Sequence, residues 1–274
     1  MKPTILYSFV FTTLSISLLA QAALIADFNF AIDRQTGLNV TDGQLLGGTT
    51  LTNDVPGGGQ SDVGSGAAYA TYDIDDEGLS DRPGADGFAM NAEGGYVWFP
   101  SEPLASPMAT RGPFSAWARI KRTAVNSGEL LFENIIGRPA YVNDNWFVGI
   151  LSNGNFGIAV NLFGEFFDSE VECELDTWYD LGVSYDGTGN SDGTMILYLD
   201  GAEIGTYENP TIPSGDVFHM LGGSAGWNRF LGRADRVMFW DTAEDEETFF
   251  NLTVPEPGLA LLSFGLLALL LRRT

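Results

Sequence analysis

Short runs in which apolar and polar residues alternate dominate the middle of the chain. A period of two residues places every second side chain on the same face, which indicates half-buried β-strands. The run from 114 to 120 puts four apolar residues on one face: Phe114, Ala116, Ala118 and Ile120. Segments with the 3.6-residue period of a helix are nearly missing from the sequence. The pattern therefore predicts an all-β chain.

Further predicted strands share this alternation and are bounded by glycine, asparagine or aspartate. They cover residues 24–30, 96–99, 146–151, 156–162, 178–185, 195–199, 202–206 and 230–240. Asn153-Gly154 and Asp200-Gly201 each join two of these runs, and both dipeptides favour the type I′ turn of a β-hairpin. Many closely spaced strands without helices between them predict two antiparallel sheets packed as a sandwich or jelly roll.

Two parts of the body depart from this pattern. Residues 31–83 are rich in Gly, Asp, Thr and Asn, and we expect long loops with a few short strands there. One helix is predicted from Thr242 to about Leu252, with Thr242 as its N-cap and Asp245 as the acid of a capping box.

The N-terminus has the features of a secretory signal peptide. Lys2 precedes an apolar stretch from Ile5 to Ala20, and Ala20-Gln21-Ala22 is typical of a cleavage site. We expect residues 1–22 to be removed, so that the mature protein begins near Ala23 and works outside the cytoplasm.

The C-terminus ends in a short apolar segment. Residues 258–271 carry no charge and are followed by Arg272 and Arg273. A helix needs about 20 residues to cross a bilayer core of about 30 Å, so a permanent anchor is not favoured. The two arginines favour the cytoplasmic side. A buried helix of a soluble domain is the alternative, but such a helix should show a polar face.

Together the two ends resemble the PEP-CTERM sorting class. The resemblance rests on the signal peptide and on Val254-Pro255-Glu256-Pro257, the apolar segment and the terminal arginines. It implies a Gram-negative bacterium that makes exopolysaccharide. It also implies transient insertion of the C-terminal helix into the inner membrane and its removal by an exosortase. The sorting residues would be Pro255, Glu256, Pro257, Arg272 and Arg273. The expected parts are a signal peptide at 1–22, a β-domain at 23–253 and a sorting signal at 254–274.

Charge and cysteine content limit which partners the protein can bind and which disulfides it can form. The chain has 13 basic and 36 acidic residues and a net charge of −23. The body without its two ends keeps 10 basic and 35 acidic residues, a net charge of −25. Nucleic acid and anionic membrane surfaces would repel such a body. Cys173 is the only cysteine, so no intramolecular disulfide forms, and we interpret Cys173 and the single histidine, His219, as packing residues.

Four stretches of the body resemble the laminin-G-like, concanavalin A-like jelly-roll family. They are Phe114-Ser115-Ala116-Trp117-Ala118, the segment 178–187 with its Tyr-Asp-Gly, Leu197-Tyr198-Leu199-Asp200-Gly201, and the closing strand 231–240. The similarity covers roughly residues 24–252, although Arg236 replaces an acidic residue of the family pattern. It implies two curved antiparallel sheets of about six or seven strands each. Most members recognise glycans or proteins, and some related jelly rolls are glycoside hydrolases or lyases.

The catalytic pattern of such hydrolases is incomplete here. Retaining hydrolysis needs two carboxyl groups roughly 5 Å apart. Glu129 and Glu133 have the offset to share a strand face, but Leu131 stands where the family carries a third carboxylate. We interpret both glutamates as solvated or rim residues, and a polysaccharide-active hydrolase or lyase stays as the alternative.

The sequence favours a binding protein at the cell surface or in the extracellular matrix. Trp146, Trp227 and Tyr141 are candidates to stack on sugar rings, while core packing is the alternative for any tryptophan. The expected partner is exopolysaccharide or a cell-surface protein. A structural matrix protein without a ligand is a further alternative.

A structural Ca²⁺ is also predicted. Asp235 has the same parity as Val237 and Phe239, and a carboxylate on a core face needs a partner or a metal. The family resemblance implies a calcium site where the first and last strands meet, which would add Asp27 as a ligand. The alternative is that Asp235 binds backbone amides or pairs with Arg233.

Overall fold

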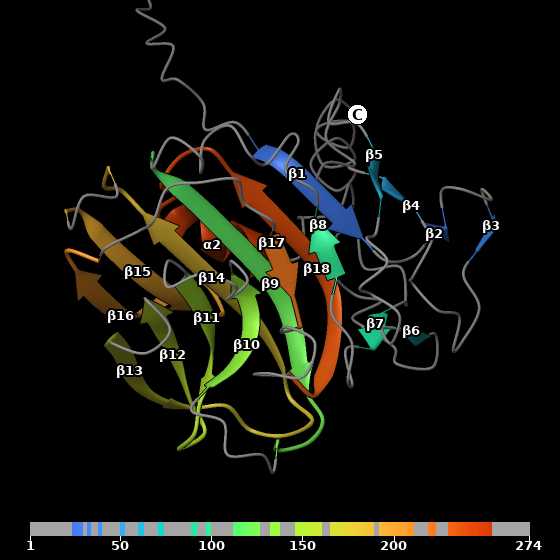
Figure 1. Cartoon of the computed structure of the whole chain (residues 1–274), viewed down its shortest axis with the longest axis horizontal. Helices are drawn as coiled ribbons and strands as arrows, with labels where there is room; N and C mark the ends of the chain where they lie inside the picture. The colour runs from blue at the N-terminus through green and yellow to red at the C-terminus, as the bar shows by residue number, and fades with distance from the viewer. Residues whose placement is uncertain are drawn as a thin grey trace, which may run out of the picture.

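The computed structural model (Figure 1) describes residues 24–29, 32–33, 38–39, 50–52, 60–62, 71–73, 89–91, 97–99, 112–126, 132–137, 146–160, 165–188, 192–210, 219–222 and 230–253. Ten described strands of six or more residues form most of the fold, and the first nine are β1 (Leu24–Asn29), β9 (Phe114–Arg122), β10 (Phe132–Gly137), β11 (Trp146–Leu151), β12 (Asn155–Val160), β13 (Glu165–Glu172), β14 (Trp178–Tyr185), β15 (Thr194–Leu199) and β16 (Ala202–Glu208). The last strand is β18 (Gly232–Trp240), and the helix α2 (Glu246–Thr253) follows it.

The other described strands are short. They are β2 (Ile32–Asp33), β3 (Leu38–Asn39), β4 (Thr50–Thr52), β5 (Gln60–Asp62), β6 (Thr71–Asp73), β7 (Ala89–Asn91), β8 (Val97–Phe99) and β17 (His219–Leu221). Those within residues 31–83 have two or three residues each, as the Gly-rich and Asp-rich composition predicts.

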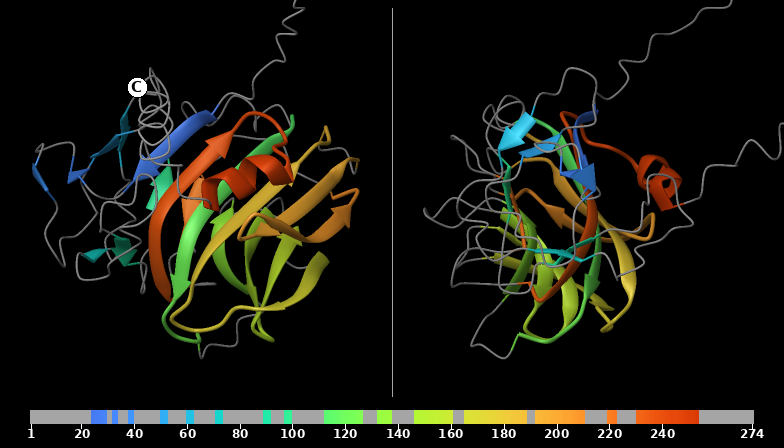
Figure 2. Two further views of the ribbon diagram at one scale, coloured as in Figure 1. Left: turned by 180° about the vertical axis from the view of Figure 1, so that it is seen from behind. Right: turned by 90° about the vertical axis from the view of Figure 1, so that its right-hand side faces the viewer.

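Two antiparallel sheets face each other (Figures 1 and 2). The eight-stranded sheet has the order β16-β15-β14-β9-β18-β7-β6, with β1 also paired to β18. The six-stranded sheet has the order β13-β12-β11-β10-β17-β8. This is a jelly-roll sandwich of the concanavalin A type, and the all-β prediction is confirmed.

The core lies between the two sheets and is built largely from alternate residues of the long strands. Phe114, Ala116, Ala118 and Ile120 of β9 all belong to it, as the alternation predicts. The facing strand β11 contributes Trp146, Val148 and Ile150. Burial of these apolar side chains is the main force that holds the sheets together.

The two predicted hairpin turns differ. Asp200 and Gly201 both have positive φ, 49° and 84°, which confirms a type I′ turn. At the other turn only Gly154 has positive φ, 93°, so the type I′ prediction is wrong there. The Asn153 side chain accepts a hydrogen bond from the Asn155 N–H at 3.1 Å, and Gly154 N–H donates to Leu151 O at 2.9 Å. Asn153 thus supports the turn through its side chain instead of adopting a left-handed backbone.

Helix α2 begins later than predicted. Asp245 is its N-cap, because the Asp245 carboxylate accepts a hydrogen bond from the Thr248 N–H at 3.0 Å. Thr242 lies before the helix, and its carbonyl accepts from the Ser115 hydroxyl at 2.8 Å. This bond ties the segment before the helix to β9.

A β-bulge interrupts β18. The pairing with β9 shifts between Ala234 and Arg236, so Asp235 is the extra residue. The core residues of this strand are Ala234, Val237 and Phe239. The prediction that Asp235 continues the alternation of Val237 and Phe239 is therefore wrong.

Within the described residues, none of the helices has the length and apolarity needed to cross a membrane. The predicted signal peptide (1–22) and sorting signal (254–274) lie outside the described residues.

Candidate functional site

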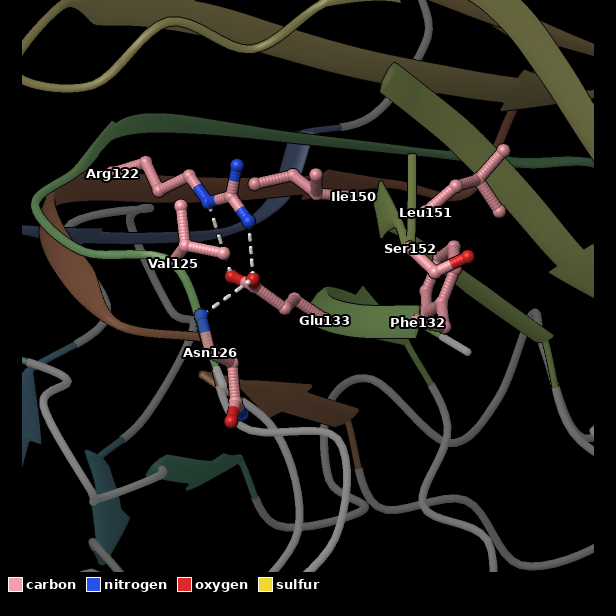
Figure 3. Close-up of a pocket in the computed structure, with 8 residues that line it drawn as sticks. All are labelled: Arg122, Val125, Asn126, Phe132, Glu133, Ile150, Leu151 and Ser152. Atoms are coloured by element: carbon pink, nitrogen blue, oxygen red, sulfur yellow. Dashed lines mark hydrogen bonds and ion pairs between the residues drawn. The ribbon is translucent and has the colours of Figure 1, made fainter. Parts of the chain in front are cut away.

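A cavity of about 100 Å³ lies where β9 ends, β10 begins and β11 ends (Figure 3). Apolar and polar side chains line it together: Arg122, Val125, Asn126, Phe132, Glu133, Ile150, Leu151 and Ser152. Val125 stands in the segment after β9 and is 58% exposed. The cavity therefore has an exposed apolar residue at its edge and a charged pair at its base.

The charged pair joins the two sheets. Arg122 has the parity of the core-facing residues of β9, and Glu133 lies opposite the core residue Ile150. Both side chains are buried, and they meet at the end of the sandwich. Arg122 Nε donates to Glu133 Oε2 at 3.3 Å, and Arg122 Nη2 donates to Oε1. The Asn126 N–H also donates to Oε1, at 3.1 Å.

Glu133 is thus a buried ion-pair partner, and the interpretation of Glu133 as a solvated or rim residue is wrong. Its two oxygens accept three hydrogen bonds, two of them from the guanidinium. A catalytic nucleophile or acid needs an oxygen directed at the substrate. Glu129, its predicted partner, lies outside the described residues.

The volume of the cavity limits what it can hold. A water molecule occupies about 30 Å³ in the liquid, so about three water molecules would fill it. The cavity can accept a hydroxylated edge of a larger molecule but not several sugar rings in a row.

Asn134, the next residue of β10, has no hydrogen-bond partner for either side-chain atom. It points away from the core, lies opposite Gly149 and is only 1% exposed. Phe132 and Phe147 are on the same face, with ring centroids 6.3 Å apart. A buried amide without partners costs roughly 1–3 kcal/mol, and it offers both a donor and an acceptor.

The predicted sugar-stacking residues do not form this site. Trp146 is 2% exposed and stacks on Phe114 in the core, with ring centroids 4.8 Å apart. A sugar has no access to its ring, so the ligand-binding prediction is wrong for Trp146. Trp227 and Tyr141 lie outside the described residues.

The predicted calcium ligands have other partners. Arg236 donates to both oxygens of Asp27, with Nε at 2.7 Å from Oδ1. A cation at Asp27 would have to displace this guanidinium, so the donor set does not fit Ca²⁺ as it stands. Asp235 is buried in the bulge and takes part in interactions of its own. No group of three or more His, Cys, Asp or Glu converges among the described residues. Calcium binding stays a prediction.

Cys173 fits its interpretation as a packing residue. Burial raises the pKa of the Cys173 thiol to about 12. The reactive form of cysteine is the thiolate, so this thiol is inert near neutral pH. His219 lies in β17, opposite Phe99 of β8.

Sequence reasoning did not single out Arg122 or Asn134. Arg122 follows four core-facing residues at the same parity, and a charged residue at such a position needs a buried counter-ion. That signal was present in the alternation. The partnerless amide of Asn134 has no comparable sequence signal, because it depends on which side chains surround it.

The chain belongs to the concanavalin A-like lectin/glucanases superfamily. The family's Laminin_G_3 profile matches residues 91–248, which is more than half of the chain. The match covers the strands that form the cavity and the core, and it agrees with the resemblance seen in the sequence.

Solved structures support the same fold. The chain is similar to domain 4 of AbnA, a GH43 extracellular arabinanase from Geobacillus stearothermophilus, in complex with arabinotriose. The identity is 14%, the TM-score is 0.52, and the alignment covers 85% of this chain and 99% of that chain. A Trypanosoma rangeli sialidase with 2,3-difluorosialic acid shows 10% identity and a TM-score of 0.52, over 86% of this chain and 33% of the sialidase. At these identities the likeness shows the fold alone. Among curated proteins, none matches the chain.

Proposed function

We propose that the protein is an exported glycan-binding protein of the cell surface or extracellular matrix. The observation that carries this proposal is the cavity at the end of β9, β10 and β11. Val125, Phe132 and Leu151 give it apolar walls, and the Arg122–Glu133 pair gives it a polar base. Sugars present both C–H patches and hydroxyl groups, and such a mixed surface complements them.

The structural neighbours are consistent with a role connected with carbohydrate. The arabinanase domain aligns over 99% of its length and was solved with arabinotriose. Its name describes that protein, and the low identity transfers only the fold. It does supply a defined oligosaccharide to test.

Binding is proposed in preference to hydrolysis. Glu133 has both oxygens occupied by Arg122 and the Asn126 N–H. A cavity of about 100 Å³ holds part of one sugar, whereas cleavage within a polysaccharide needs rings on both sides of the bond. The geometry of this site thus favours recognition of a chain end or a protruding substituent.

Calorimetric titration of the purified protein with arabinotriose and with the producer's own exopolysaccharide tests the proposal. Val125→Trp should fill the exposed edge of the cavity and weaken binding at least about tenfold. Phe250→Trp is the control, since Phe250 is 53% exposed on α2 and does not line the cavity. Failure to bind either sugar, or equal binding by both variants, would argue against this site.

A reducing-sugar assay on the same samples distinguishes the enzymatic alternative. The proposal expects no release of reducing ends by the wild-type protein. Release that disappears in Glu133→Gln, while circular dichroism shows that the variant is still folded, would identify a glycoside hydrolase instead. A matrix protein without a ligand would give neither binding nor release.

We also propose that the chain reaches this location through its two ends. The signal peptide at 1–22 would direct export, and an exosortase would recognise Pro255, Glu256 and Pro257. This part of the proposal rests on the sequence pattern.

A further inference from the structure

A second apolar cluster lies on the outer face of the eight-stranded sheet, separate from the core. It consists of Trp117, Tyr198, Met238, Trp240 and Phe249, all buried. Phe249 of α2 lies 4.5 Å from Tyr198 and 6.1 Å from Trp240, measured between ring centroids. Figure 2 shows α2 lying across this outer face, with β18 and β1 beside each other. We call this set the outer cluster.

Both ends of the described body reach the outer cluster. Leu24 at the start of β1 lies opposite Trp240 and packs against the cluster. Leu252 in the last turn of α2 packs against the same cluster. Leu24 directly follows the expected mature N-terminus, Ala23, and Leu252 precedes the Pro-Glu-Pro motif by three residues. Leu24 and Leu252, the described residues near the two expected processing junctions, therefore both pack on the same face of the sheet.

The connections from this face to the apolar segments are short. Leu24 is four positions after Ala20, and Gly258 is six positions after Leu252. An extended chain spans at most about 3.6 Å per residue, so these connections reach at most about 14 Å and about 22 Å. A body tethered in this way cannot turn its opposite face to the surface that holds both segments.

We propose that the precursor rests on the membrane with the α2 and β1 face toward the bilayer and the six-stranded sheet toward the outside. This inference relies on the proposed export and sorting of the chain. It places β10 and β11, which carry the cavity, in the sheet turned away from the lipid. The face that carries α2 would contact the lipid surface. Phe250 is an exposed apolar residue on that face.

Tethering, and not electrostatic attraction, holds this orientation. Asp200, Glu246 and Glu247 surround Phe250 at an open depression beside the helix. These carboxylates would be repelled by anionic headgroups. The orientation should therefore also form on neutral lipid, and the body without its ends should not bind vesicles.

The test uses the full chain on phosphatidylcholine vesicles that contain nitroxide-labelled headgroups. Two single-cysteine variants in a Cys173→Ala background carry the same fluorophore, one as Phe250→Cys and one as Phe166→Cys. Phe166 is the matched control, since it is 41% exposed on β13 of the six-stranded sheet. If Cys173→Ala does not fold, Cys173 is retained, because its burial protects it from labelling.

Quenching at position 250 should exceed quenching at position 166 by at least about twofold. Equal quenching, or stronger quenching at 166, would overturn the orientation. Flotation of the same vesicles tests membrane anchoring separately from orientation. A chain that floats but shows equal quenching is anchored without this orientation, whereas a chain that does not float overturns both the anchoring and the orientation.

Discussion

At the residue scale, the Arg122–Glu133 pair shows how a charged contact shapes this fold. Its two side chains come from opposite sheets and are buried together. Removing charges from water costs several kcal/mol per ion, so such a pair contributes little net stability while it is intact. Replacing only one of the two residues should destabilise the fold, because the remaining charge stays buried without a counter-ion.

This asymmetry gives the first prediction. Glu133→Gln leaves the Arg122 guanidinium without a counter-ion and should lower the free energy of unfolding by about 3–5 kcal/mol. The double variant Arg122→Met, Glu133→Leu should recover most of this loss, because it buries apolar groups instead. Urea denaturation of the three proteins measures the difference. A double variant as unstable as Glu133→Gln would contradict the argument.

Individual contacts were the hardest feature to predict from the sequence. Alternation placed Trp146 in a strand, but it could not decide between a ring facing the core and a ring facing a sugar. The same alternation failed at Asp235, because a bulge adds one residue without a change in composition. Asp27 was predicted as a calcium ligand, whereas it pairs with Arg236, which is 209 positions away in the chain. These outcomes depend on tertiary packing, which a local pattern does not contain.

At the element scale, α2 depends on one glycine of β14. A Cβ atom at Gly182 would lie 2.7 Å from Cδ1 of Phe249, which is shorter than van der Waals contact. The missing side chain thus makes room for the ring that anchors the helix on the sheet. Most of the long strands followed from the sequence, since alternation indicates a strand that buries one face. β10 and β13 were not predicted, because β10 is buried at all six positions and β13 has no buried position, so neither shows a clear alternation of buried and exposed residues. The start of the helix did not follow from the sequence either, because Thr242 and Asp245 are both acceptable caps and Ser115 decides between them.

The second prediction follows from this contact. Gly182→Ala should push Phe249 off the sheet and lower the free energy of unfolding by about 1–3 kcal/mol. In a Phe249→Ala background the same substitution should cost much less, because the clash is gone. Thermal denaturation of the four proteins of this cycle tests the coupling. Equal penalties in both backgrounds would show that Gly182 matters for another reason.

At the scale of the whole molecule, the body and its two ends are chemically distinct. The body carries a net charge of −25, while the end segments are apolar with basic termini. Under the proposed sorting, the acidic body would be exported and then released from its C-terminal apolar segment. The sandwich could be predicted from the sequence, since strand spacing and motif order both indicate it. The cavity could not, because it forms between residues of three strands.

The third prediction concerns processing of the native chain. Mass spectrometry of the exported protein should find the N-terminus near Ala23 and the C-terminus near Pro255 to Pro257. Alanine in place of Pro255, Glu256 and Pro257 is the control and should leave the tail attached. Peptides that end at Thr274 in the mature wild-type protein would refute the sorting proposal.

The pairing of β1 with β18 also determines when the eight-stranded sheet can form during synthesis. The first long strand pairs with the last one, and about 215 residues separate Leu24 from Trp240. At a synthesis rate of about 5–20 residues per second, β1 waits about 10–40 s before its partner exists. Such distant pairing is slow to form, and an unpaired strand is prone to aggregate in the interval. The eight-stranded sheet therefore closes only after nearly the whole body has been made.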